Sequence, residues 1–519
     1  MALVIMDLRW HTSVKGLNFL SVVLILLSLM NNKIPFIAIP LLLSACSSGG
    51  IFTTVGPDYI ADKPTTPTNW YSPQPDYEAQ KLAHQGKLAE LIHWWEHFHD
   101  PVLTRLLSAA ETVNPNLADA KARIEEARAN VVNADGAVLP SIDFSQGVKR
   151  SSSSFGGTPF MWNQYSTGLQ SSWEVDLFGG LARQQQAARS QLESRNAAWH
   201  DARVAVAVEV ADAYLAYRYL EVQKQIMQAD TASRIESSRL TAIANEQGFY
   251  SQSEVALARA SAAEGNKSVL QQTAQSERAI KSLVAMTAIE EPVLRQLLNP
   301  ASDQSAKLPS PAKFTIDTLP AKVLLQRPDV AAAERDVAEA SANIGVQRAK
   351  QYPKLSLSGN ITPTLQNING GALLLAQTWA IGPTLSLPLF DSGKRAADVE
   401  AAKAKYQAAS SRFHSKVRTA VKEVEQALVR LNSADKILPE AQLVVEGYST
   451  HFKAVQTLYQ NGLGNLLNVE VARRQRLTAE LAVKELEREQ VSAWIALYRA
   501  AGGNWSKDQN NDTNNGKKS

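Results

Sequence analysis

The stretch that decides the fold is residues 114–144, NPNLADAKARIEEARANVVNADGAVLPSIDF. Residues 327–357, RPDVAAAERDVAEASANIGVQRAKQYPKLSL, align with it without a gap at a constant offset of 213 positions. Matched pairs include Pro115/Pro328, Glu126/Glu339, Ala127/Ala340, Asn130/Asn343 and Pro140/Pro353. The surroundings repeat too, so the repeated unit is far larger than the roughly 20 to 50 residues of a solenoid unit. The sequence therefore predicts one body made of two similar halves, residues 81–300 and 301–503.

Each half is expected to open with a helix. Pro115 and Pro328 stand where proline fits the first helical position. The two helices are expected to end just before Pro140 and Pro353. Asp100-Pro101 is a further helix start of the same kind, with aspartate as the cap.

Past these helices the hydrophobic period changes from helical to alternating, which indicates amphipathic strands. Two strands of roughly ten residues are expected in each half, joined by loops at residues 150–163 and 363–377. The apolar positions that alternate are Ile142, Phe144, Val148, Leu169, Trp173, Val175, Leu355, Leu357, Ile361, Trp379, Ile381 and Leu385. The chain is thus predicted to contain two β-hairpins.

A very long helical arm follows each hairpin. Residues 181–247 contain no Gly or Pro, and a helix over that whole range would span roughly 100 Å. Its counterpart, residues 394–461, is interrupted only by Pro439 and Gly447. Each arm is expected to end at a glycine that takes the left-handed conformation. It then returns as a helix, the first to about residue 286 and the second to about residue 501.

The N-terminal region reads as a lipoprotein signal. Cys46, the single cysteine, directly follows an apolar run at residues 34–43 and the small residues Ser44 and Ala45. This pattern resembles the bacterial lipobox, which implies removal of residues 1–45 and lipidation of Cys46. The alternative is a lone buried thiol.

Four further expectations concern the ends of the chain. A second apolar run before Met30 is not needed for one signal peptide, which indicates a translation start at Met30. Ser47 after the lipidated cysteine implies, by resemblance, release to the outer membrane. Residues 46–80 are rich in Pro and Ser and predict an extended tether, and residues 504–519 predict a disordered polar tail.

Composition excludes several classes of function. Net charge is +3, and the 53 Lys+Arg are scattered among 50 Asp+Glu, so nucleic acid is not an expected partner. Past residue 45 no apolar run reaches the roughly 18 to 20 residues of a membrane-spanning helix. No phosphate-binding loop, nucleotide fingerprint or Gly-x-Ser-x-Gly elbow occurs. We therefore expect no enzyme and no cofactor.

Four amphipathic strands cannot close on themselves, and an open sheet edge has no backbone partners in lipid. Three chains would supply twelve strands, enough for a transmembrane barrel with a lumen. The predicted fold class is therefore mixed α and β, mainly α. In it a trimer forms a 12-stranded β-barrel continuous with an α-helical barrel.

Several short segments, in their order and spacing, resemble the lipoprotein branch of the TolC-like outer membrane efflux proteins. They are Trp94-Trp95-Glu96-His97-Phe98, Asn114-Pro115, Leu139-Pro140, Ser172-Trp173-Glu174-Val175-Asp176-Leu177-Phe178-Gly179, Arg327-Pro328-Asp329-Val330, Gly382-Pro383, Leu387-Pro388-Leu389-Phe390-Asp391 and Gly502-Gly503. The resemblance implies a homotrimeric outer membrane channel with helices in the periplasm. It would be a passive conduit for drugs or other small toxic compounds, working with a periplasmic adaptor protein and an inner-membrane transporter. Two alternatives stay open: a channel for type I protein secretion, and a periplasmic coiled-coil scaffold lipoprotein.

The resemblance also implies a gate and a docking surface at the helix turns. Glu254 follows the first turn where relatives often carry an acid, whereas Asn468 and Val471 stand where relatives carry Asp after the second. The candidate gate residues are Glu254, Asn468, Glu470 and Arg474, and the candidate adaptor contacts are Gly248, Phe249, Gly462 and Leu463. The alternatives are an ordinary solvated helix face and a simple helix-hairpin turn.

One motif points to different chemistry. His93, Glu96 and His97 fit the H-x-x-E-H pattern of inverted zinc peptidases. A packing segment is the preferred interpretation, because a zinc site also needs a third ligand. We therefore expect no metal. The six Met form no cluster that would favour export of soft metal ions.

Overall fold

The computed structural model describes residues 53–61, 67, 69–72, 94–298, 308–310, 324 and 326–503. Met30, Cys46, Ser47, His93, the predicted signal peptide, most of the tether and the polar tail lie outside these residues. The chain divides into two compact units, Met1–Thr53 and Thr54–Ser519. The second unit contains all the described helices and strands.

The predicted duplication is confirmed by the order of the elements. The first half contains α4 (Pro115–Gly136), β1 (Ser141–Phe155), β2 (Thr158–Val175), α5 (Gly180–Glu246) and α6 (Gln252–Thr287). The second half repeats this order as α9 (Pro328–Ala349), β3 (Lys354–Ile368), β4 (Leu374–Ser386), α10 (Lys394–Gln460) and α11 (Leu466–Ala500). Two shorter helices, α3 (Pro101–Val113) and α7 (Glu291–Leu298), lie outside the repeat.

Local chemistry sets the helix boundaries where the sequence predicted them. The Asp100 carboxylate accepts hydrogen bonds from the backbone of Val102 and Leu103 at the start of α3. Gly248 and Gly462, with φ of 78° and 74°, end the two long arms in the left-handed conformation. α10 continues through Pro439, although a proline at this position was expected to interrupt the helix. One lost hydrogen bond does not end a helix that is packed along its length.

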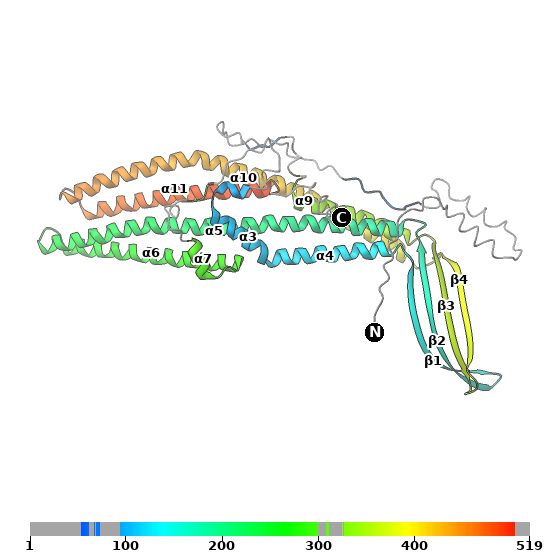
Figure 1. Cartoon of the computed structure of the whole chain (residues 1–519). Coiled ribbons are helices and arrows are strands. Elements are labelled where there is room, and N and C mark those ends of the chain that lie inside the picture. The colour runs from blue at the N-terminus through cyan, green and yellow to red at the C-terminus, as the bar shows by residue number, and fades with distance from the viewer. Residues whose placement is uncertain are drawn as a thin grey trace. The chain divides into compact units, whose positions relative to one another are not determined.

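The four strands form one antiparallel sheet in the order β1-β2-β3-β4, so the two predicted hairpins are confirmed (Figure 1). The predicted loops at residues 150–163 and 363–377 are wrong, because most of these residues continue the strands. The turn between β1 and β2 is only Gly156-Gly157. The run Ser151–Ser154 has no hydrophobic alternation to reveal a strand, but its backbone pairs fully with β2.

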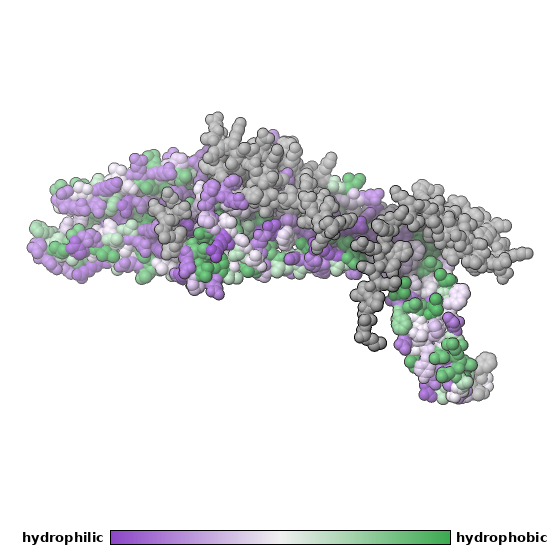
Figure 2. Space-filling view, in the orientation of Figure 1, coloured by the Kyte–Doolittle hydropathy of each residue, from purple (hydrophilic) through white to green (hydrophobic). Residues whose placement is uncertain are grey.

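The register gives the sheet one apolar and one polar face. One row across the four strands is Phe144, Leu169, Ile361 and Trp379. The next row, on the other face, is Asp143, Gln170, Asn360 and Ala380. All four members of the first row are exposed, and Figure 2 shows hydrophobic residues gathered along the strands. The sheet thus presents an uncovered apolar surface.

The helices pack side by side. α5 contacts α4, α6, α9 and α11, while α10 contacts α9 and α11. The main core lies near the middle of α5 and includes Leu106, Tyr214, Leu428, Trp494 and Tyr498. Within the described part of the chain, none of the helices has an apolar stretch long enough to cross a lipid bilayer.

Candidate functional site

The candidate adaptor contacts lie at the two helix turns and are open to solvent. The side chains of Phe249 and Leu463 are 81% and 77% exposed. Each follows the left-handed glycine of its turn, Gly248 or Gly462. Exposed large apolar groups at rigid turns are available for contact with another protein.

Glu254 stabilises its own helix. Its carboxylate accepts hydrogen bonds from the backbone N–H and hydroxyl of Ser251 at 2.8 and 2.9 Å, and the Ser251 hydroxyl faces the Glu254 N–H. This reciprocal arrangement is a capping box at the start of α6. Glu254 therefore makes no contact with the other gate candidates.

Asn468 and Arg474 are exposed on α11. The backbone N–H of Asn468 donates to the Asn465 side chain, which caps the helix. Arg474 forms no hydrogen bond or ion pair with any residue in the part of the chain that the structure describes. Neither side chain forms a hydrogen bond or ion pair with another helix among the described residues.

Glu470 is buried and connects helices. Its carboxylate accepts a hydrogen bond of 2.6 Å from the Ser261 hydroxyl of α6. It also lies 3.5 Å from both Arg234 Nη1 of α5 and Arg473 Nε of α11. Glu470 thus joins three helices rather than facing an open ring.

Around Glu470 lies a group of charged side chains that we name the arginine cluster. Its members are Asp230, Arg234, Glu470, Arg473 and Arg476. The Arg234 Nε to Asp230 Oδ2 distance is 2.6 Å, whereas Arg473 Nη1 and Arg476 Nη2 stay 4.0 and 3.9 Å from Asp230 Oδ1. One tight ion pair is therefore surrounded by looser ones.

Arg473 is the most unusual member. Its side chain is 0% exposed, and only Nη2 donates a hydrogen bond, to the Ser237 hydroxyl at 3.1 Å. Within the described part of the chain, Arg473 Nε and Nη1 have no hydrogen-bond acceptor, and Asp230 Oδ1 has no hydrogen-bond donor. Burial lowers the pKa of Arg473 in spite of the attraction of Glu470 and Asp230. Incompletely bonded buried charges raise the free energy of this conformation.

Aromatic side chains complete the contact between helices. The Phe452 ring of α10 lies under the guanidinium groups of Arg476 and Arg473, at 4.4 and 5.4 Å from the ring centre. Nearer the turns, the rings of Tyr250 and Tyr459 stack at 5.4 Å. The Tyr459 hydroxyl is 3.0 Å from that of Thr241. Burial, followed by the hydrogen bond to Tyr459, raises the pKa of Tyr250 to about 12.

The sequence reasoning found Glu470 but missed the four other members of the arginine cluster. Asp230 and Arg234 are spaced i, i+4 on one helix face, which is a readable signal for a pair. Arg473 and Arg476 also stand three and four residues from an acid, Glu470 and Glu480, but this spacing does not reveal the burial of Arg473, which depends on α11 packing against α5. The cluster links α5, α6 and α11 through ion pairs and hydrogen bonds.

The H-x-x-E-H segment packs through its aromatic residues. Trp94 stacks on Tyr498 with ring centres 4.5 Å apart, and Phe98 is buried beside it. Glu96 and His97 are exposed. Among the described residues, no group of three or more His, Cys, Asp or Glu side chains could hold a metal ion.

Comparisons with known proteins agree with this architecture. A family model described as outer membrane efflux protein matches residues 106–288 and 319–503. The solvent efflux pump outer membrane protein SrpC of Pseudomonas putida is 27% identical over 420 residues, 80% of this chain and 88% of that protein. Nodulation protein T of Rhizobium leguminosarum bv. viciae is 30% identical over 469 residues, 88% of this chain and 92% of that protein. The structure of the outer-membrane channel OprN has 28% sequence identity and a TM-score of 0.75, and the match covers 87% of this chain and 99% of OprN.

The match covers both halves of the duplicated unit, the sheet and the long helices. It also extends over most of the length of each relative. The predicted resemblance is therefore confirmed, and the chain belongs to the outer membrane efflux protein family.

Proposed function

We propose that this chain is one of three identical subunits of a passive outer membrane conduit, without catalysis of its own, in a tripartite efflux system. The observation that supports this most strongly is the four-stranded sheet with one apolar face and two free edges. The solutes would be drugs or other small toxic compounds, as the name of the solvent efflux relative suggests. A periplasmic adaptor protein and an inner-membrane transporter would supply delivery and energy.

The free edges support a shared barrel. Among the described strands, β1 and β4 each pair on one side only. Unpaired backbone groups are costly in lipid, and three copies of the sheet would supply twelve strands and remove every edge. On β2 the apolar face runs from Tyr165 to Val175, roughly 33 Å along the strand. Strands tilted by roughly 40° would turn this length into a band about 25 Å tall, as in outer membrane barrels.

The helices also leave surfaces that suit a second and third copy. Leu443 of α10 and Leu270 of α6 are 63% and 71% exposed. α11 packs between α5 and α10 within the chain, whereas α6 packs mainly against α5. Neighbouring subunits would cover these apolar faces and close the helices into a tube.

The segment at residues 55–58 supports the proposed lipid anchor at Cys46, because it binds beside the end of β2 and at the start of α5. The Val55 N–H donates to the Phe178 carbonyl at 3.0 Å, next to the end of β2. Arg183 donates to the Val55 carbonyl and pairs with Asp58 at 2.7 Å. Cys46 precedes Val55 by nine residues, so an extended chain reaches at most roughly 30 Å from that point. A lipid anchor on Cys46 would therefore be attached within that length of chain from Val55, which is bound next to the end of β2.

The arginine cluster is the proposed gate link, with Glu470 as its predicted member. It joins α11 to α5 and α6 a short way from the turns, so it holds the helical end of the tube closed. Phe249 and Leu463 would receive the adaptor, whose binding would help α11 to move. Glu254 would act in this region as part of a helix cap, and Asn468 and Arg474 as exposed polar side chains.

The test uses the full-length lipidated protein purified in detergent. We expect the mass of a trimer by light scattering, stepwise currents in planar bilayers, and a band on gels that shifts on heating. A monomer without conductance would contradict the channel and favour a periplasmic scaffold. Export of a co-expressed protein substrate, without any effect on drug tolerance, would favour secretion instead.

A further inference from the structure

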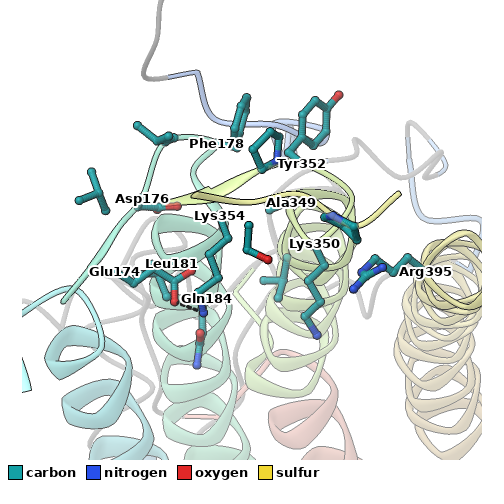
Figure 3. A pocket seen from close by; sticks show the side chains of 17 residues that line it. Glu174, Asp176, Phe178, Leu181, Gln184, Ala349, Lys350, Tyr352, Lys354 and Arg395 are labelled. Atoms are coloured by element: carbon teal, nitrogen blue, oxygen red, sulfur yellow. Dashed lines mark ion pairs between the residues drawn. The ribbon is translucent and has the colours of Figure 1, made fainter. Parts of the chain in front are cut away.

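A pocket lies where the sheet meets the helices, far from the turns (Figure 3). Its volume is about 430 Å³. The ends of β2, β4 and α9 and the starts of β3, α5 and α10 contribute to it. We name it the junction pocket, and the residues used below are Glu174, Asp176, Leu181, Lys350, Lys354 and Arg395.

The pocket belongs to the polar face of the sheet. Lys354 pairs in register with Ser386, and Glu174 with Ser356, in the rows that carry hydroxyl and charged groups. The apolar row beside them contains Val175, Leu355 and Leu385. In the proposed trimer the apolar face meets lipid, so the pocket opens toward the lumen. This step rests on the proposed function.

The two acids that line the pocket already have partners within the chain. Lys354 Nζ forms an ion pair of 2.6 Å with Glu174. The Asp176 carboxylate accepts a hydrogen bond from the Ala182 N–H at the start of α5. The charge of Glu174 is thus paired with Lys354, and that of Asp176 is directed at the positive end of α5.

Two cations keep donors that are not satisfied. Lys350 Nζ donates to the Gln347 side chain at 3.0 Å and pairs with no acid among the described residues. Arg395 Nη1 binds Asp391 at 2.8 Å, while Nε and Nη2 have no acceptor in the described part of the chain. Figure 3 shows both side chains on the same side of the pocket. They offer an ammonium and the free edge of a guanidinium group to an anion.

The surroundings of these cations combine two helix starts with an apolar wall. α5 and α10 both begin here, and the carboxylates of Asp176 and Asp391 accept hydrogen bonds from backbone N–H groups at these two helix starts, so both acids are held at the positive helix ends. Apolar groups from Leu181, Val346, Ala349 and Pro388 line the same pocket. A ligand with an anionic head and a compact apolar body fits both kinds of surface.

We propose that the junction pocket is a binding site for amphiphilic organic anions, such as aromatic sulfonates or carboxylates, on their way through the lumen. Lys350 and Arg395 hold the anionic head, and the apolar wall receives the body. A trimer would present three such sites at one level of the tube, which would favour the entry of anionic solutes into the barrel.

The test is calorimetric titration of the full-length protein in detergent with 1-naphthalenesulfonate, with 1-naphthylmethylammonium as the probe of opposite charge. We expect one sulfonate per chain, no binding of the ammonium probe, and binding weakened by about tenfold or more in Lys350→Ala with Arg395→Ala. The matched control is Lys149→Ala, which removes a lysine from the same polar face but outside the pocket. It should bind like the wild type.

Equal sulfonate affinity in the double variant and the wild type would overturn the proposal. An equal loss of sulfonate affinity in Lys149→Ala would also overturn it, because it would show that any positive charge on the polar face attracts the sulfonate. Bilayer conductance of the same samples separates the two proposals. Binding without conductance would contradict the channel but keep the site, and conductance without binding would contradict the site alone.

Discussion

The two return helices, α6 and α11, have nearly the same length, 36 and 35 residues, yet their charges lie in different surroundings. Arg259 and Arg473 stand at the same distance from the helix caps, Ser251 and Asn465. Arg259 is exposed, whereas Arg473 is completely buried. The reason is that α11 packs against both α5 and α10.

This difference shows what a duplication can and cannot supply. The repeated hairpin and long arm provide the wall of the efflux channel twice over. The link between helices is built once, from Asp230 and Arg234 of the first half and Glu470, Arg473 and Arg476 of the second. The two halves are alike in architecture and unlike at the place that would control opening.

The largest expected effect comes from removing Arg473. Arg473→Ala leaves Asp230 and Glu470 buried with fewer partners, and breaking a buried pair costs roughly 3–5 kcal/mol. We expect a lower free energy of unfolding and a melting temperature several degrees below that of the wild type, measured by circular dichroism in detergent. Arg259→Ala is the matched control and should change little. Equal melting temperatures of the two variants would contradict a difference between α6 and α11.

The second prediction compares the acids of the two helices. Glu470→Gln keeps the hydrogen bond from Ser261 but loses the charge facing Arg234 and Arg473, which should cost about 2 kcal/mol. Glu254→Gln retains the reciprocal capping geometry and should cost well under 1 kcal/mol. Thermal melting of both variants measures this. A larger loss of stability in Glu254→Gln than in Glu470→Gln would show that the acid of α6 stabilises the fold more than that of α11.

The contact nearest the turns should have a smaller effect. Tyr459→Phe removes the hydroxyl that bonds Thr241 and Tyr250 but keeps the stacking on the Tyr250 ring. A hydrogen bond of this kind contributes about 1 kcal/mol. Hydrogen exchange should therefore speed up in α10 near Tyr459 and remain unchanged in α6 near Ser276. Unchanged exchange at both places would argue against a link at Tyr459.

The smallest expected effect is a pH dependence of the free energy of unfolding, caused by His200 of α5. Burial, with a further contribution from Arg203, lowers the pKa of His200 from 6.5 to about 4. The unfolded chain then binds more protons between these values, so the free energy of unfolding falls as pH falls from about 6.5 toward 4. His200→Gln should flatten this dependence, and His97→Gln, at an exposed position, should not. Identical pH profiles for the wild type and His200→Gln would contradict the prediction.

The sequence was enough to predict elements whose signals are local. Proline at the helix starts and glycine at the turns correctly placed the starts of α4 and α9 and the ends of both long arms. The hairpin loops were misplaced because Ser151–Ser154 has no alternation, and its strand exists through pairing with β2. The burial of Arg473 depends on a contact between α11 and α5, residues more than two hundred positions apart, which periodicity does not reveal.

The most direct test of the account is the single-channel open probability of the purified full-length protein in planar bilayers. We expect a mostly closed wild type, a clearly more open Arg473→Ala, and an Arg259→Ala that behaves like the wild type. Equal open probability in all three proteins would contradict the claim that the link made by Arg473 of α11 holds the channel closed.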